Sequence, residues 1–366
     1  MRILYLSLSY VPSRRASSVQ VMRMCAALAR AGHQVRLCAK QSQEPAPDGD
    51  HAFYGVPPSF SLHKLPRPRR RGGGVVFSAA MAAQIVRHHR STDLVFCRDL
   101  LGAVMADQAR LPVLFEAHSL PASPLLRRLW RSLVSSPRLR RLVVISEALR
   151  RDVEAAGLLP RHGSVVVAHD AAEAPAQVTL RGGAAPRKVG YVGSLYPGRG
   201  IEVIFELARR LPQLRFEVIG GTEADLARWR PTAPPNATLH GFVPPGQLAA
   251  RYAELDILLM PYARAGVGGP LAATDTSRWC SPMKMFEYMA SGAPIVSSDL
   301  PVLQEVLLHE HNALIAPIDD LDAWQQAITR LCAEPQTREW LAGNALRDLR
   351  RLYTWDARAE KVLAGL

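Results

Sequence analysis

The sequence predicts an α/β protein of two doubly wound, Rossmann-like parallel-sheet domains that face a central cleft. Apolar runs of strand length alternate with helical patterns along almost the whole chain, which is typical of βαβ units. The length of 366 residues exceeds what one ordinary core accommodates, so two domains are expected. Residues 171–186, rich in Ala, Pro and Gly, interrupt the alternation and are the best linker candidate. We therefore predict domains at 1–172 and 187–351, joined by a linker at 173–186.

The first domain begins with a strand at the N-terminus. A helix follows from about Ser18 to Ala31, and Gly32 is its expected stop because glycine readily adopts the left-handed conformation found there. Residues 41–74 are rich in Pro, Gly and Arg and are predicted to form a long variable excursion. Helical segments separate the remaining strands. The expected strands are 2–7, 34–39, 93–97, 113–117, 142–146 and 164–168.

The second domain repeats this alternation. Ser281 and Pro282 predict a helix start, with a hydroxyl cap followed by proline at the first helical position, and Gly292 ends that helix. About 45 residues at the C-terminus have a helical pattern. The expected strands are 188–193, 215–220, 238–243, 256–261, 294–298 and 313–317. In sheets of this kind, ligands bind at the carboxyl ends of the strands.

Composition is that of a folded soluble protein, with 48% hydrophobic and 21% charged residues. The five cysteines are scattered and form no CxxC pair, so the sequence favours neither a disulfide framework nor a zinc site, and a reducing cytosol fits best. The longest weakly polar run, residues 75–86, is shorter than the roughly 20 residues that span a bilayer. The N-terminal "MRILYLSLSY" fits a strand better than a signal peptide.

The net positive charge of the chain lies entirely in its first half. Residues 1–180 hold 25 basic and 12 acidic residues, whereas residues 181–366 hold 20 of each. The basic residues cluster at 67–71, 127–131 and 138–141. A solvated arginine-rich surface explains these clusters, and so does an anionic membrane surface or an acidic lipid-linked substrate. No nucleic-acid motif or interleaved aromatic residue supports a nucleic-acid partner.

The predicted helix after Ser281 carries two charges, Lys284 and Glu287, among apolar residues on every side. A simple helix pair would explain them on an exposed helix. In apolar surroundings, however, a carboxylate without partners is costly, and the hydroxyls of a bound sugar or ribose would satisfy Glu287. The start of the helix gathers free N–H groups, which favour anions such as phosphate.

A second candidate element is "YVGSLYPGRGIEVI", residues 191–204, predicted as strand, loop and helix. Gly193, Gly198 and Gly200 allow close approach of a ligand to the backbone, and Arg199 adds a fixed positive charge. The glycine spacing matches neither a Walker loop nor GxGxxG. A third element, residues 237–262, presents a strand end that fits either a nucleobase contact or a plain strand–loop–helix.

Together these segments resemble retaining glycosyltransferases of the GT-B fold, specifically glycosyltransferase family 4 (glycosyl transferases group 1). The stretches "YVGSLYPGRGIEVI", "HGFVPPGQLAARYAELDILLMPY" and "SPMKMFEYMASGAPIVSSDLPVLQEVL" are similar to the donor-binding half of that family. The stretches "SVQVMRMCAALARAGHQVRL", "FEAHSLP" and "VVISEALRRDV" are similar to its acceptor half. The resemblance covers nearly all of the chain except residues 41–90, and it implies that a final helix, about 352–366, packs back on the first domain.

The resemblance implies a role for each matching position. Glu287 corresponds to the glutamate that binds the ribose hydroxyls, Arg199 to the basic residue on the diphosphate, and His118 to the histidine near the reaction centre. These three are the expected catalytic residues. The expected donor-binding residues are Ser194, Gly198, Gly241, Val243, Trp279, Cys280, Ser281, Met283, Lys284 and Glu287. Among them, Ser281 and Met283 stand where backbone amides meet the diphosphate, and Gly241 and Val243 stand near the base.

Three positions depart from the family pattern. Trp279 stands where a first glutamate usually touches the transferred sugar, which puts the sugar contacts in question. Ser194 replaces a frequent arginine, which leaves Arg199 and Lys284 to neutralise the phosphates. The residues Ala16, Ser17 and Ser18 replace a Gly-Gly loop on the acceptor side.

The expected function is transfer of a hexose-type sugar, with retention, from a nucleotide sugar to a glycan or lipid-linked acceptor of cell-surface polysaccharide or lipopolysaccharide synthesis. No cofactor or metal is expected, and the expected location is cytoplasmic, at the inner membrane face. Two alternatives stay open, a sugar-nucleotide epimerase of the same fold and a non-catalytic glycan-binding relative. An NAD-dependent dehydrogenase is disfavoured because "LSLSYVPSRRASS" after the first strand lacks GxGxxG.

Overall fold

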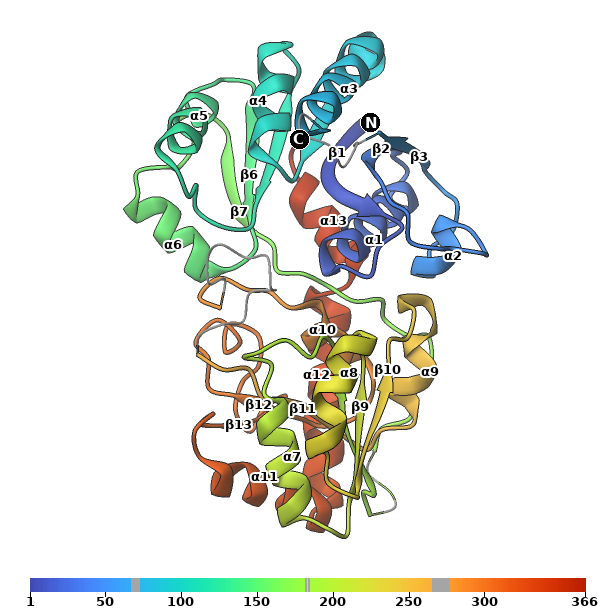
Figure 1. The fold of residues 1–366 in the computed structure, drawn as a ribbon. Coiled ribbons are helices and arrows are strands. Elements are labelled where there is room, and N and C mark those ends of the chain that lie inside the picture. Colours follow the sequence, from blue (N-terminus) through green and yellow to red (C-terminus); the bar gives the residue numbers. More distant parts are fainter. Residues whose placement is uncertain (67–72, 182, 184, 265–276) are drawn as a thin grey trace. The chain divides into compact units, whose positions relative to one another are not determined.

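The computed structural model describes residues 1–66, 73–181, 183, 185–264 and 277–366. The chain forms two compact units. Unit 1 comprises Met1–Asp170 together with Trp355–Leu366, and unit 2 comprises Ala171–Thr354. Each unit contains one parallel sheet flanked by helices (Figure 1), which confirms the predicted fold class.

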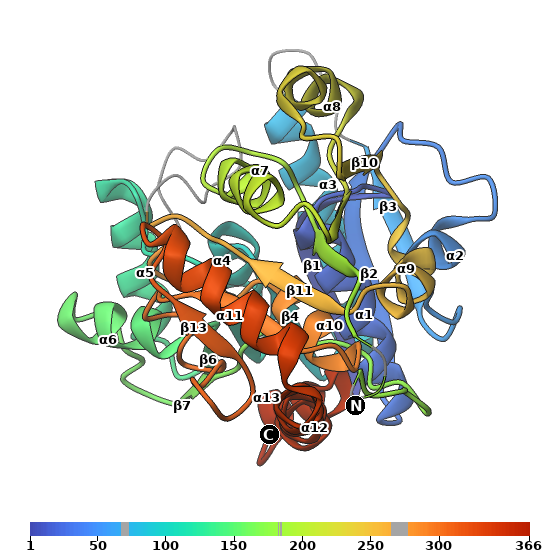
Figure 2. The ribbon, with the colours of Figure 1, turned by 90° about the horizontal axis from the view of Figure 1, so that it is seen from below.

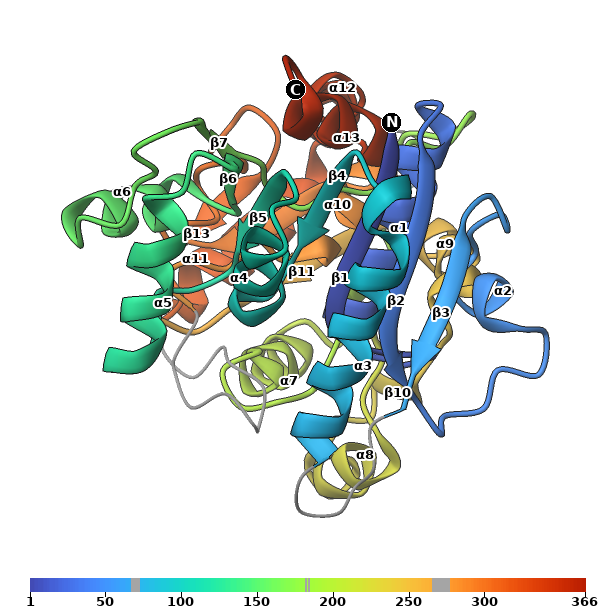
Figure 3. The same ribbon diagram turned by 90° about the horizontal axis from the view of Figure 1, so that it is seen from above.

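Unit 1 is built on a seven-stranded sheet with the order β3-β2-β1-β4-β5-β6-β7. Its strands are β1 (Arg2–Val11), β2 (Gln34–Gln41), β3 (Ser61–Leu65), β4 (Leu94–Cys97), β5 (Val113–Ala117), β6 (Leu139–Val144) and β7 (Ser164–Val167). Figure 3 shows these strands side by side. Every residue of β4 and β5 is buried, as expected for central parallel strands covered on both faces.

The helices of unit 1 include one from the far end of the sequence. They are α1 (Ala16–Arg30), α2 (Asp50–Tyr54), α3 (Gly73–His88), α4 (Leu100–Gln108), α5 (Pro124–Val134), α6 (Glu147–Ala155) and α13 (Trp355–Leu363). Helix α13 packs against α1. Buried Arg141 of β6 fixes its end by donating to the carbonyl oxygens of Val362 and Ala364, at 2.8 and 2.7 Å.

The predicted excursion at 41–74 contains regular structure in its described part, so the prediction was wrong there. Strand β2 continues to Gln41, helix α2 follows, and β3 pairs in parallel with β2 from Ser61 to Leu65. Strand β3 lies at the edge of the sheet, so it can form from the polar sequence "SLHKL" that lacks a strong strand pattern. The whole of the basic cluster 67–71 lies outside the described residues.

Unit 2 is built on a six-stranded parallel sheet with the order β10-β9-β8-β11-β12-β13. Its strands are β8 (Lys188–Val192), β9 (Arg215–Ile219), β10 (Ala237–Gly241), β11 (Ile257–Met260), β12 (Ile295–Ser298) and β13 (Leu314–Ala316). Its helices are α7 (Ile201–Arg210), α8 (Glu223–Trp229), α9 (Leu248–Ala253), α10 (Met283–Ala290), α11 (Leu321–Ala333) and α12 (Pro335–Leu352). Figure 2 shows these helices around the sheet.

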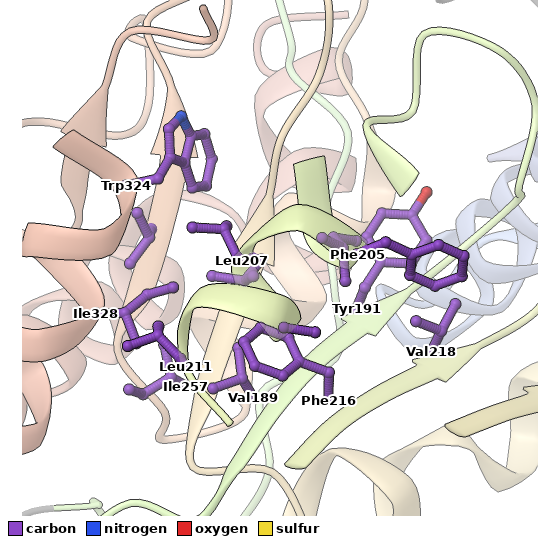
Figure 4. Close-up of a cluster of buried hydrophobic side chains, with 14 of the residues drawn as sticks. Val189, Tyr191, Phe205, Leu207, Leu211, Phe216, Val218, Ile257, Trp324 and Ile328 are labelled. Atoms are coloured by element: carbon purple, nitrogen blue, oxygen red, sulfur yellow. The ribbon is translucent and has the colours of Figure 1, made fainter. Parts of the chain in front are cut away.

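The core of unit 2 fills the space between its sheet and helices α7 and α11. Figure 4 shows Phe205 and Leu207 of α7 with Trp324 of α11 over the strand residues Val189 and Phe216. All five are buried to 2% exposure or less. This packing fixes β8 and α7, and therefore the loop between them, in one position.

Two predicted helix starts differ from the structure. Pro282 occupies the N-cap position of α10 and no side chain caps the helix, so the hydroxyl cap predicted at Ser281 was wrong. Proline fits there because its φ is restricted and it has no N–H to satisfy. Helix α1 begins at Ala16 after Arg15, so Ala16, Ser17 and Ser18 form its first turn and not a loop. Among the described residues, none of the helices is long and apolar enough to cross a membrane.

Candidate active site

In unit 2, the loop between β8 and α7 is held tightly against the end of β11. Gly200 has a φ of 78°, and a Cβ at this position would lie 2.0 Å from the carbonyl oxygen of Pro261. The amide of Ala263 donates to the carbonyl oxygen of Gly198 at 2.9 Å. Only glycine allows this approach at position 200. As a result, Arg199 is held with its guanidinium carbon 4.4 Å from the ring centre of Tyr262.

Lys284 of α10 lies against the same tyrosine ring as Arg199. Its Nζ lies 3.8 Å from the ring centre of Tyr191 and 4.7 Å from that of Tyr262. A Cβ added at Gly193 would lie 2.9 Å from this Nζ, so the glycine makes room for the ammonium group. Burial, and then the charge of Arg199, lower the pKa of Lys284 well below its ordinary value.

These two cations contain buried donors that the described part of the chain does not satisfy. Both Nζ of Lys284 and Nε of Arg199 are buried without a hydrogen-bond partner there. The aromatic rings stabilise cations, but an unsatisfied buried donor still costs about 1–3 kcal/mol. An anion between the two side chains would remove that cost and the mutual repulsion. The cluster therefore has the chemistry of an anion site.

Glu287, one turn after Lys284, has a fixed partner. The hydroxyl of Tyr252 in α9 donates to its Oε2 at 2.7 Å. The neighbouring Tyr288 is also fixed, because its hydroxyl accepts from the amide of Val192 at 2.8 Å. These contacts orient α10 relative to the end of β8, and the carboxylate of Glu287 is close enough to Lys284 to oppose the lowering of its pKa.

The structure brings some of the other predicted donor residues to this cluster and leaves others apart. Ser194 lies in the Arg199 loop, where its carbonyl oxygen accepts from the hydroxyl of Tyr191 at 2.6 Å. Half-buried Trp279 and Cys280 and buried Ser281 lead into α10, whose first residue is Met283. Gly241 is the last residue of β10 and Val243 comes two residues later, and in the sheet order β10 lies two strands away from β8.

In unit 1, His118 follows β5 and lies between a cation and an anion. Its Nε2 is 2.8 Å from Oε1 of Glu116, and Nε of Arg98 donates to the same nitrogen at 3.0 Å. Burial and the adjacent Arg98 lower the pKa of His118 to about 4, although Glu116 opposes this shift. The imidazole is therefore neutral at physiological pH, and its side chain keeps 28% exposure.

Glu116 is fully buried, and its carboxylate is surrounded by donors. Gln20 donates to Oε1 at 2.8 Å, and Arg358 of α13 donates to Oε2 at 3.0 Å. Burial alone would raise the pKa of Glu116, but Arg358, His118 and Arg98 together hold it well below its usual range. Arg98 also donates to the carbonyl oxygen of Ser17 at 2.9 Å, so the first turn of α1 is tied to the same group.

Several residues of these sites were missed by the sequence analysis. In unit 2 they are the tyrosines Tyr191, Tyr252 and Tyr262, and in unit 1 they are Arg98 and Glu116. Tyr262 and Arg98 come directly after predicted strands, and Glu116 is a charged residue inside an apolar strand pattern. A polar residue directly after a strand and a charge inside an apolar strand each indicate, from sequence alone, a site at the carboxyl edge of a sheet. Tyr252 has no such indication because it lies on a helix.

No metal site is evident within the described ranges, where no three His, Cys, Asp or Glu side chains gather in a suitable geometry. The two parallel sheets and their crossover helices define a protein of the GT-B class, as comparisons with solved structures show. Sucrose-phosphate synthase from Thermosynechococcus elongatus has a TM-score of 0.71 at 18% identity, covering 98% of this chain and 96% of that one. Anabaena HepE, solved with UDP-glucose, has a TM-score of 0.71 at 16% identity, covering 99% and 98%.

Sequence comparison identifies the family. The family described as Glycosyltransferase Family 4 matches residues 17–166, and the one described as Glycosyl transferases group 1 matches residues 186–334. The two matches together cover most of the chain, which belongs to this family of glycosyltransferases. A Bacillus subtilis glycosyltransferase named for teichuronic acid biosynthesis is 25% identical over 145 residues. That match covers 38% of this chain and 34% of the relative, so the chain spans about a third of that protein's length.

Proposed function

We propose that this protein transfers a sugar from a nucleoside-diphosphate donor to a hydroxyl group of a glycan or lipid-linked acceptor, with retention at the anomeric carbon. Family membership supports the class of reaction. The observation that carries the proposal is the pair of buried donors without partners in the described chain, Nε of Arg199 and Nζ of Lys284. A diphosphate has the charge and the acceptor oxygens to satisfy both.

In this mechanism Arg199 and Lys284 act on the leaving diphosphate. Negative charge builds there in the transition state, and fixed donors aimed at that charge are the expected main source of rate enhancement. The N–H groups at the start of α10, near Ser281 and Met283, add to this stabilisation. Glu287 accepts from the ribose hydroxyls, and neutral His118 positions the sugar. Neither the diphosphate charge nor the ribose contact requires a metal ion under this proposal.

The donor is proposed to be a nucleotide sugar, with UDP-sugars as the first to test. Support comes from the fold relative HepE, which was solved with UDP, with UDP and glucose, and with UDP-glucose. The hexose-transferring subtype rests on the resemblance alone. Metal independence is tested by activity in excess chelator, and loss of activity that magnesium restores would contradict it.

The acceptor is proposed to be lipid-linked or a cell-surface glycan, handled at the cytoplasmic face of the membrane. Relatives named for teichuronic acid and lipopolysaccharide synthesis support this class. In unit 1, α5 presents exposed Arg127, Arg128 and Arg131 beside Leu125, which is 66% exposed. Arginines next to exposed leucines suit an anionic lipid surface. Glutamate at the three arginine positions should weaken binding to anionic vesicles, and unchanged binding would contradict the membrane proposal.

The decisive experiment measures donor binding and turnover with matched arginine variants. Thermal-shift screening against UDP, GDP, ADP and their sugars should identify a ligand that raises the melting temperature. Arg199→Ala and Glu287→Ala should lose both this shift and sugar transfer while staying folded. Arg209→Ala, on an exposed side of the same α7, is the control and should keep both. Wild-type turnover in Arg199→Ala would refute the proposal.

The same assays separate the two alternatives. A sugar-nucleotide epimerase would convert its nucleotide sugar without any acceptor. A transferase would only hydrolyse the nucleotide sugar slowly unless an acceptor is present. A non-catalytic glycan-binding relative would bind across a full donor set without turnover. Trp279, at the position of an expected sugar-binding glutamate, is the residue to vary if binding without transfer is found.

A further inference from the structure

The carboxylate of Glu116 connects the C-terminal helix to the histidine of the proposed reaction centre. Glu116 lies two residues before His118 at the end of β5, and its side chain is completely buried. Its Oε2 accepts from Arg358 of α13 at 3.0 Å, and its Oε1 lies 2.8 Å from Nε2 of His118. Arg358 is separated from Glu116 by 242 residues and is itself 2% exposed.

Arg358 is anchored by more than this ion pair. Its Nε donates to the carbonyl oxygen of His169 at 2.8 Å, and its Nη2 also donates to that of Ala168 at 3.3 Å. The guanidinium is therefore fixed in one orientation between the end of β7 and the end of β5. A fixed guanidinium presents a fixed donor to Glu116, and this determines where the second oxygen of the carboxylate points.

Arg98 completes the arrangement on the opposite side. Its guanidinium lies 3.5 Å from Oε1 of Glu116 and donates to Nε2 of His118 and to the carbonyl oxygen of Ser17. Glu116 and Arg98, from two adjacent strand ends, therefore both lie against Nε2 of the imidazole. In a neutral ring this nitrogen makes one hydrogen bond, donated to Glu116 when it carries the proton and accepted from Arg98 when it does not. Arg98 itself has only 10% side-chain exposure, so water competes little for these contacts.

We propose that Glu116 and Arg98 are positioning residues that clamp the ring of His118, and that Arg358 of the C-terminal helix completes the clamp by balancing the buried charge of Glu116. The inference rests on the proposed function for the meaning of the clamp but not for its geometry. It makes the last twelve residues of the chain part of the acceptor-side site of unit 1. Without Arg358, Glu116 would lose its main counter-charge, and the pKa of its carboxyl group would rise.

The charged groups around His118 predict how its titration responds. Arg98 and Arg358 lower its pKa, and Glu116 raises it. Buried Asp170, whose pKa burial raises to about 6, also faces Arg358 and Glu116. Because Arg98 is the nearest cation, its removal should raise the pKa of His118 more than any other single change.

The first test is a pH titration of His118 in the full-length protein, monitored by NMR of ¹³C-labelled histidine rings. The signal of His118 is assigned by its disappearance in His118→Ala. The wild-type pKa should be about 4, and in Arg98→Gln it should move toward the ordinary 6.5. Arg98→Gln should then lose sugar-transfer activity at mildly acidic pH, where the wild type is still active. An unchanged pKa of His118 in Arg98→Gln would overturn the clamp.

The second test asks whether α13 acts through Glu116 or only by packing. Arg358→Met and Arg141→Met each remove a buried arginine that anchors α13, but only Arg358 touches Glu116. The expected result is a loss of about 10- to 100-fold in kcat, with an unchanged donor KM, for Arg358→Met alone. Equal losses in both variants would show that α13 is merely structural and would overturn the role of Arg358.

A double variant covers the case in which Arg358→Met does not fold. In Glu116→Gln/Arg358→Met both charges are gone, and a neutral replacement of a buried ion pair is commonly tolerated. This variant should fold, keep nucleotide binding, lower the pKa of His118 below its wild-type value and keep the loss in kcat. Wild-type kcat in the double variant would overturn the proposal. If no variant or wild type transfers sugar, the proposed function fails, and the NMR titration still decides the clamp.

Discussion

Replacing Lys284 by methionine should stabilise the protein while weakening its binding of nucleotide. Methionine has a similar length and fits between the rings of Tyr191 and Tyr262, but it has no charge and no donor. In the wild type, the buried Nζ has no hydrogen-bond partner within the described residues. The ligand-free protein therefore bears a cost that the methionine variant does not, whereas the complex loses a charged contact.

The magnitudes follow from these contacts. Removing an unsatisfied buried donor should raise the free energy of unfolding by about 1–3 kcal/mol, and losing the attraction to the rings should lower it by about 0.5–2 kcal/mol. The net change is then between about −1 and +2.5 kcal/mol, with a midpoint near +1 kcal/mol. The pKa of Lys284 is lowered in the folded state, so the unfolded chain holds this proton more tightly. The gain should therefore be largest below the folded-state pKa and should disappear as pH rises toward the ordinary value near 10.5. Losing a hydrogen bond from a charged group costs about 1.5–3 kcal/mol, or roughly 10- to 150-fold in UDP affinity.

The assays are urea unfolding from pH 6 to pH 10 and calorimetric titration with UDP or the donor found by screening. Lys361→Met, at an exposed position of α13, is the control and should change neither quantity. A methionine variant that is destabilised by more than about 1 kcal/mol, or that binds nucleotide equally well, would refute the interpretation of Lys284 as a buried cation of an anion site.

Three further predictions concern single contacts. Tyr252→Phe removes the hydroxyl that donates to Glu287, so nucleotide affinity should fall by about fivefold in calorimetric titration, and an unchanged affinity would separate this contact from ribose binding. Burial raises the pKa of Asp99 from 3.8 to about 6. Asp99→Asn should therefore increase the free energy of unfolding by ~3 kcal/mol above pH 6, as measured by denaturant unfolding. The gain should vanish below pH 4, where the wild-type carboxyl becomes protonated in both the folded and the unfolded state. Gly200→Ala should destabilise by about 2 kcal/mol or more, because its Cβ would overlap a carbonyl oxygen at positive φ, whereas Gly74→Ala, with open space around it in α3, should be neutral or stabilising; equal effects in thermal unfolding would contradict this.

The fold was predictable because its central strands are apolar and its turns have clear residue patterns. "LVFC" and "VLFEA" are buried throughout and lie side by side as β4 and β5, and Gly32, with a φ of 85°, follows the end of α1. Strand β3 was not predictable in the same way. At a sheet edge a strand needs little burial, so its sequence carries little hydrophobic periodicity.

The cation pair of unit 2 was predictable in part. Lys284 and Glu287 drew attention because charges in an apolar helix need partners, and Arg199 because it lies among glycines. The sequence could not show that the aromatic rings of Tyr191 and Tyr262 enclose the cations, since those tyrosines look like ordinary strand-end residues. Nor could it show that Arg358 meets Glu116, because nothing local relates residues on β5 and α13.

The two candidate sites differ in charge balance, and this difference matches the two kinds of substrate in the proposed reaction. In unit 1, Arg98 and Arg358 face Glu116 and Asp170, and His118 is neutral, so the group is balanced without any ligand. Binding an anion would upset the charge balance of this site, whereas binding a neutral hydroxyl acceptor or sugar would not. In unit 2, Arg199 and Lys284 outnumber the single carboxylate of Glu287, and their buried donors have no partners among the described residues. That imbalance costs stability in the free protein, and a diphosphate would remove it, so under the proposed function unit 2 is the unit that would bind the charged donor.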